Sequence, residues 1–179
     1  MLHTILPTQM QAAEQTAFAA GLSPLLTMET AARAAFDVLL DLLGCDCRGK
    51  NVLFLCGPGN NGGDGLVMAR LLLQARGSAR IILLDTPKTA EAQINLRHLQ
   101  AMGADIEAVP DELLEDEYDA VVDALFGTGF TGSIAADSPA GRLLTWANTC
   151  GPMLSIDVPS GMDAATGAVE GVCARAIWT

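Results

Sequence analysis

The sequence predicts an α/β fold, a Rossmann-like three-layer α/β/α arrangement around a mostly parallel, doubly wound sheet. Two observations predict this class: short apolar runs alternate with segments of helical periodicity, and glycines and acids follow several of the runs. Strands of a parallel sheet are buried on both faces and are therefore apolar throughout. The chain has 179 residues, enough to bury a core without disulfides, so we expect one domain spanning residues 1–179.

Two helices are expected before the first strand, at residues 9–20 and 24–43. The second has apolar residues at helical spacing and stops before a glycine, Gly44. We expect both helices to pack against the rest of the domain.

The strands and helices then alternate. We expect strands at 52–56, 80–85, 104–109, 118–123 and 152–157, helices at 66–75 and 88–102, and an amphipathic stretch at 139–148. Residues 174–179 have the pattern of a strand that begins as the sequence stops. We therefore expect the domain to be truncated at its C-terminus.

Composition excludes several classes of protein. Half of the residues are hydrophobic and 17% are charged, which argues against disorder, and no apolar run is long enough for a membrane span. The start lacks the features of a secretory signal, so the cytoplasm is the expected location. Cys45 and Cys47 could in principle hold a metal, but no second Cys or His pair stands at zinc spacing, so we expect reduced thiols and no zinc site.

The net charge of −11 repels nucleic acid and anionic membranes, so neither is an expected partner. No cluster of Lys or Arg is available for a phosphate-bearing small ligand. Backbone N–H groups, a helix N-terminus or a bound cation would have to receive it.

Three expected strands end in segments that combine carboxylates with glycines, at 57–65, 123–129 and 157–163. Ligands of open parallel sheets bind beyond the carboxyl ends of the strands, so a shared site is favoured over three unrelated turns.

The first segment matches two known patterns only in part. Its glycines satisfy GxGxxG, and Asp85 ends the next expected strand, as in a dinucleotide-binding dehydrogenase. However, Asn60, Asn61 and Asp64 add polar groups that a plain phosphate cradle does not need. The segment is not a P-loop either, because Gly63 and Asp64 stand where Lys and Ser or Thr belong.

The three segments together resemble the YjeF N-terminal domain family, the NAD(P)H-hydrate epimerases. The resemblance rests on GPGNNGGDG (57–65) followed by LVMAR (66–70), VDALFGTG (122–129) and SIDVPSGMDAATG (155–167), in that order. It extends more loosely to the N-terminal helices and to residues 174–179, and so covers nearly the whole chain.

The resemblance implies an isomerase that interconverts the R and S epimers of hydrated NADH and NADPH in nicotinamide nucleotide repair, with no redox change. By resemblance, a potassium ion is bound through Asn61, Asp123 and Ser160. The damaged nucleotide is contacted by the positions Asn60, Asn61, Gly62, Gly63, Asp64, Gly127, Thr128, Gly129, Phe130, Thr131, Gly132, Ser133 and Asp157.

The chemistry of these residues is compatible with that function. Amide, carboxylate and hydroxyl oxygens suit K⁺, and the cation would offset negative charge near a diphosphate. Epimerisation can proceed by loss of the hydroxyl to an iminium-like intermediate and readdition from the other face. We expect Asp157 to be the catalytic residue that exchanges the proton or stabilises the cationic ring, unless it merely caps the following turn. Ser160 lacks the GxSxG elbow and histidine order of a hydrolase.

Two other functions stay open at this point: a sensor or scaffold that binds an NAD(P)-like ligand without turnover, and a Rossmann dehydrogenase. The resemblance also suggests a homodimer, for which the sequence has no independent interface signal. It further suggests a fused or separate ADP- or ATP-dependent dehydratase as a partner.

Overall fold

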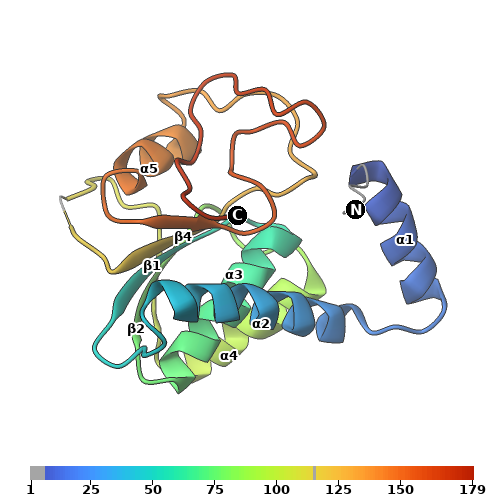
Figure 1. The fold of residues 1–179 in the computed structure, drawn as a ribbon, viewed down its shortest axis with the longest axis horizontal. Coiled ribbons are helices and arrows are strands. Elements are labelled where there is room, and N and C mark those ends of the chain that lie inside the picture. Colours follow the sequence, from blue (N-terminus) through green and yellow to red (C-terminus); the bar gives the residue numbers. More distant parts are fainter. Residues whose placement is uncertain (1–6, 115) are drawn as a thin grey trace.

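The computed structural model describes residues 7–114 and 116–179 (Figure 1). Its helices are α1 (Pro7–Ala19), α2 (Pro24–Leu42), α3 (Asn60–Gln74), α4 (Ala90–Ala101) and α5 (Pro139–Ala147). Its strands are β1 (Asn51–Cys56), β2 (Ser78–Leu83), β3 (Asp105–Ala108), β4 (Ala120–Ala124) and β5 (Met153–Ser155).

The five strands form one sheet in the order β3-β2-β1-β4-β5, and all neighbouring pairs are parallel. The predicted α/β fold is thus confirmed, and the sheet is parallel throughout its named strands. The chain winds outward from β1 in one direction and then from β4 in the other. The strand order therefore reverses between β1 and β4, where open α/β sheets place their ligands.

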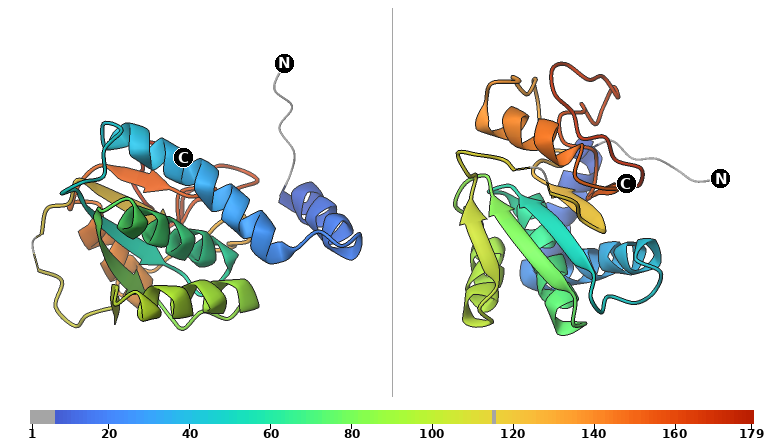
Figure 2. Two further views of the ribbon diagram at one scale, coloured as in Figure 1. Left: turned by 90° about the horizontal axis from the view of Figure 1, so that it is seen from below. Right: turned by 90° about the vertical axis from the view of Figure 1, so that its left-hand side faces the viewer.

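Helices cover both faces of the sheet (Figures 1 and 2). Successive residues of β1 point to opposite faces, as the period of a strand requires. Phe54 belongs to the core beneath α2, α3 and α4, whereas Leu53 and Leu55 belong to the core beneath α5. This explains why β1 is an unbroken apolar run in the sequence.

Helix α3 begins at Asn60, six residues earlier than expected, so most of the glycine-rich segment is its first turns. The glycines permit close packing there. A Cβ on Gly62 would lie 1.8 Å from the carbonyl oxygen of Gly57, and one on Gly57 would lie 1.8 Å from that of Leu125. The helical propensity of glycine is low, and tertiary packing overrides it here.

Helix α1 does not pack as expected. It stands beside the body of the domain (Figure 1), and only Ala17 and Phe18 are half-buried among its described side chains. The helix contains mostly alanine and polar residues and has no continuous apolar stripe, so burying it would gain little. Helix α2, in contrast, buries Met28, Phe36 and Leu39 as predicted.

The expected C-terminal strand is present only as a short pairing at the edge of the sheet. Ile177 donates its N–H to the Met153 carbonyl at 2.9 Å, and the Ser155 N–H donates to the Trp178 carbonyl at 3.0 Å. These contacts form an isolated parallel bridge between Leu154 and Trp178.

None of the helices in the described part of the chain combines the length and the apolar character that a bilayer crossing needs.

Candidate functional site

The three motif segments lie beside one another at the carboxyl edge of the sheet. They follow β1, β4 and β5, and β4 pairs with both of the others. The first residue after β1 is tied to the end of β4, since the Gly57 N–H donates to the Ala124 carbonyl at 2.9 Å. The structure thus brings the segments together at the point where the strand order reverses.

Asp123 is the buried centre of this edge. Its Oδ1 accepts the Ser160 hydroxyl at 2.6 Å and the Leu125 N–H at 3.3 Å. Its Oδ2 accepts the Ser155 hydroxyl at 2.7 Å and the Ser160 N–H at 2.9 Å. These bonds join the end of β4 to β5 and to the loop after it.

Burial raises the pKa of the Asp123 carboxyl above its ordinary value, although its hydrogen bonds from Ser160 and Ser155 oppose this. A buried carboxylate without a cationic partner is costly, and a nearby cation would favour the charged form. The described residues contain no cluster of three or more His, Cys, Asp or Glu side chains suited to a metal. A cation here would therefore depend mainly on neutral oxygen ligands.

Neutral ligands are available from Ser160, which contacts Asp123, and from Phe126 and Asn61 in the neighbouring segments. The Ser160 hydroxyl lies 2.9 Å from the Phe126 N–H and 3.2 Å from the Phe126 carbonyl oxygen. The Asn61 Nδ2 atom is buried and has no hydrogen-bond partner among the described residues. Rotation of that amide would exchange its nitrogen for an oxygen. A carboxylate, a hydroxyl, a carbonyl and an amide fit a hard monovalent cation in chemical kind.

Asp157 lies in the loop after β5 with a φ of 69°, in the left-handed region that side chains other than glycine rarely adopt. Its Oδ2 accepts the Thr128 N–H at 2.6 Å. The carboxylate therefore reaches across to the loop after β4 and does not cap the turn that follows it. Backbone strain of this kind is found at functional sites more often than elsewhere.

Gly127 is the point where Asn61 and Asp157 meet. A Cβ on Gly127 would lie 2.6 Å from the Asp157 Oδ2 and 3.4 Å from the Asn61 Cγ. A glycine is therefore required here for the two side chains to approach each other. Predicted residues from all three segments thus converge within a few ångströms.

Asp64 lies one turn along α3 and is half-buried. Burial, and then the negative charges of Asp157 and Glu14, raise the pKa of Asp64 to about 7. Asp157 lies in the loop after β5, and Glu14 lies on α1. Asp64 is therefore the described carboxyl group in this region that changes charge near neutral pH.

The other predicted contact residues differ in their surroundings. Asn60 is exposed, whereas Gly62 and Gly63 are buried against neighbouring elements. Thr128 and Gly129 begin an exposed loop, in which the Phe130 ring packs on Phe126 with centroids 4.9 Å apart. Among the described contacts, none links the outer residues Thr131, Gly132 and Ser133 to α3.

Asp85, the acid that the dehydrogenase pattern would use for a ribose, lies outside the group of converging residues. The side chain is exposed and pairs with Lys88 at 2.9 Å. Conversely, three contributors were missed: Ser155 as a partner of Asp123, Glu14 as a neighbour of Asp64, and the proton-binding character of Asp64. All three depend on contacts between residues that are far apart in the sequence, and no local sequence pattern indicates such contacts.

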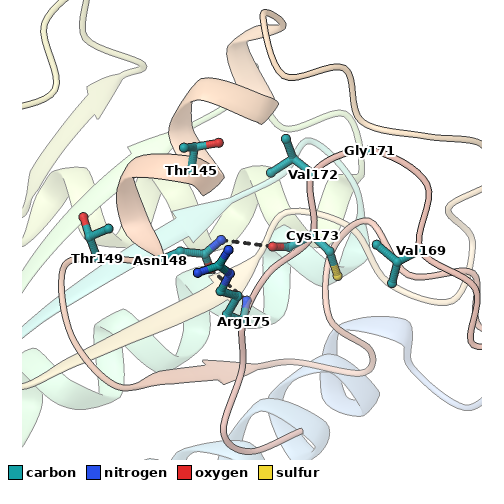
Figure 3. Close-up of a pocket in the computed structure, with 8 residues that line it drawn as sticks. All are labelled: Thr145, Asn148, Thr149, Val169, Gly171, Val172, Cys173 and Arg175. Carbon is teal, nitrogen blue, oxygen red and sulfur yellow. Dashed lines mark hydrogen bonds between the residues drawn. The ribbon is translucent and has the colours of Figure 1, made fainter.

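A hollow of about 490 Å³ lies outside the candidate site, between α5 and residues 169–175 (Figure 3). Asn148 spans its floor, donating to the Cys173 carbonyl at 3.0 Å and accepting the Arg175 N–H at 2.8 Å. The hollow contains none of the predicted site residues. The candidate site is therefore assigned from the convergence of polar groups at the strand ends and not from the volume of this hollow.

The chain is similar to known proteins over most of its length. Residues 26–179 match the family model described as YjeF-related protein N-terminus. The chain is 37% identical over 185 residues to the bifunctional NAD(P)H-hydrate repair enzyme Nnr of Salinibacter ruber, covering 93% of this chain and 34% of that protein. It is 34% identical to the NAD(P)H-hydrate epimerase of Lentilactobacillus buchneri, covering 89% of this chain and 73% of that one.

The fold also matches a solved structure. The crystal structure of the yeast protein YNL200c superposes with a TM-score of 0.78 at 20% identity, covering 97% of this chain and 78% of the yeast chain. The present chain spans about a third of the length of the bifunctional Salinibacter relative. The family model covers most of the chain, from α2 to the last residue. The chain therefore belongs to the family of YjeF-related protein N-termini.

Proposed function

We propose that this domain is an NAD(P)H-hydrate epimerase, an isomerase that interconverts the R and S epimers of hydrated NADH and NADPH. The observation that carries the proposal is the meeting of Asn61, Gly127 and Asp157 at the point where the strand order reverses. Relatives named for NAD(P)H-hydrate repair or epimerisation support the same substrate.

The start of α3 is suited to the diphosphate of such a substrate. Its N-cap residue, Gly59, makes no side-chain capping hydrogen bond, so the first N–H groups of the helix remain available. These groups and the helix dipole favour an anion without any Lys or Arg. We propose that residues 60–64 and the loop 127–133 contact the nucleotide.

Asp157 is the proposed catalytic residue at the reacting ring. Loss of the C6 hydroxyl creates positive charge on the ring, and readdition of water from the opposite face gives the other epimer. A carboxylate held by the Thr128 N–H is positioned to stabilise that charge. No oxidant or reductant is needed.

We further propose that Asn61, Asp123 and Ser160 hold a potassium ion. When bound, the cation would offset the charge of the buried Asp123 carboxylate and of the substrate diphosphate. The unpartnered amide of Asn61 and the raised pKa of Asp123 both support this ligand set.

The test supplies the purified R epimer of hydrated NADH and follows formation of the S epimer by chromatography. We expect Asp157→Asn to lower kcat at least a hundredfold, while Asp37→Asn, which removes a charge from an exposed position of α2, leaves it unchanged. Unchanged turnover in Asp157→Asn would contradict the catalytic assignment. No turnover by the wild-type protein would favour the sensor alternative.

Cation dependence is tested in the same assay. We expect turnover in potassium to exceed turnover in lithium at equal ionic strength at least tenfold, and we expect Ser160→Ala to reduce that ratio. Equal rates in both salts would argue against a potassium site.

The setting of the enzyme is also part of the proposal. We place it in the cytoplasm, with a fused or separate ADP- or ATP-dependent dehydratase consuming the S epimer. A homodimer is the proposed assembly, and sedimentation at several concentrations tests it.

A further inference from the structure

Asp64 borders a small cavity that extends the candidate site towards α1. The cavity has a volume of about 110 Å³ and brings together side chains from four helices. Those that matter for its character are Glu14, Phe18, Met28, Asn60, Asp64 and Glu91. Phe18 and Met28 provide apolar walls of the kind that enclose a planar ring, while the acidic groups come from α1, α3 and α4.

The charged groups that the described residues place around Asp64 are all negative. Asp157 lies on the side of the candidate site, Glu14 faces it from α1, and Glu91 in the first turn of α4 lines the same cavity. No Lys, Arg or His is among the residues that line the described cavity. Asp64 has no N–H or O–H donor among the described residues, unlike the carboxylate of Asp157, which accepts the Thr128 N–H. These surroundings favour the protonated form, consistent with the pKa of about 7.

We propose that Asp64 is a second catalytic residue of the epimerase, the acid that protonates the departing C6 hydroxyl, and that Glu14 is a positioning residue that keeps Asp64 protonated. This inference rests on the proposed function. It divides two tasks between two carboxyl groups: Asp64 transfers the proton, and Asp157 stabilises the positive ring.

The step balances without any further reactant. The Asp64 carboxyl gives its proton to the C6 hydroxyl, the C6–O bond breaks, and its electron pair leaves with a water molecule. The lone pair of the ring nitrogen forms the N1=C6 double bond of the iminium. Water then adds to C6 from the opposite face and releases one proton to solvent, from which the Asp64 carboxylate takes up its proton again.

This division of tasks also assigns a function to α1. The helix buries little surface, yet it supplies Glu14 and Phe18 to the cavity. Its contribution is then to the electrostatics and enclosure of the site more than to the core of the domain.

The pH dependence of turnover tests the proposal. With the R epimer of hydrated NADH, wild-type kcat should fall as pH rises above about 7, because Asp64 loses its proton there. Glu14→Gln removes a negative neighbour and should move this decline to lower pH. Asp157→Asn should lower kcat and shift the decline in the same direction. Asp37→Asn on the exposed side of α2 should change neither.

Asp64→Asn should lower kcat at least a hundredfold, with KM changed less than threefold and an unaltered circular dichroism spectrum. Carbon-13 NMR of the Asp64 carboxyl provides a readout that does not need turnover, and its midpoint should fall in Glu14→Gln. If the wild-type protein turns over the substrate and the kcat of Asp64→Asn is within tenfold of the wild-type kcat, this inference is overturned and the proposed function is not. Absence of wild-type turnover would overturn the proposed function and this inference with it.

Discussion

Replacement of Asp64 by Asn should stabilise the folded protein, and the gain should grow with pH. The pKa of Asp64 is about 7 in the folded protein against an ordinary value of 3.8. Below the ordinary value the group is protonated in both states, so its ionisation costs nothing. As pH rises from 3.8 to about 7, the unfolded chain has released its proton while the folded state still holds one, so stability falls through this range and the loss is complete above the folded pKa of about 7.

The size of the effect follows from that difference in pKa. A difference of about three corresponds to roughly 4 kcal/mol when the full range of pH is crossed. Between pH 5.5 and pH 8 only the upper half of the range between the two pKa values is crossed, which corresponds to a loss of stability of about 2 kcal/mol. Because the side chain is half-buried, solvent screens part of this energy, and we expect about 1–2 kcal/mol.

Urea unfolding of wild type and Asp64→Asn at both pH values measures this difference, and Asp37→Asn controls for the loss of one negative charge. In thermal melts the melting temperature of Asp64→Asn relative to wild type should rise by roughly 3–6 °C over the same interval. A stability difference that is the same at pH 5.5 and pH 8 would refute the reasoning, because Asp64 would then not titrate between them.

Two further predictions concern buried residues that support the candidate site, Gly62 and Asp123. Gly62→Ala should destabilise the protein by about 2 kcal/mol or more, because its Cβ would lie 1.8 Å from the Gly57 carbonyl oxygen. Gly59→Ala, with nothing within 4 Å of the added atom, is the matched control, and equal urea midpoints for the two variants would contradict the packing argument. Asp123→Asn should cost about 2–4 kcal/mol in urea unfolding, since an amide cannot accept all four hydrogen bonds of the buried carboxylate. A loss below 0.5 kcal/mol would show that those bonds contribute little.

The features predicted correctly from the sequence were those with a local pattern. The apolar run of β1 marked a strand covered on both faces, and the strand-end rule placed Asp123 and Ser160 at one edge, where they are 2.6 Å apart. The start of α3 was misjudged because glycine suppresses a helix in isolation, whereas here the absence of side chains allows the helix to approach the strands. The raised pKa of Asp64 was not predicted, because burial and charges distant in the sequence determine it and no local pattern encodes them.

The pairing of residues 177–179 with the edge of the sheet affects when the site can form during synthesis. The Thr179 hydroxyl donates to the Asp157 carbonyl at 2.9 Å, and Ile177 and Trp178 hold β5. Strands β1 to β4 precede these residues by more than fifty positions and can assemble while the chain is still being made. The loop that carries Asp157 gains its last supports only after residue 179 has left the ribosome. A stalled or clipped chain would then hold a nearly complete sheet with an unfinished site.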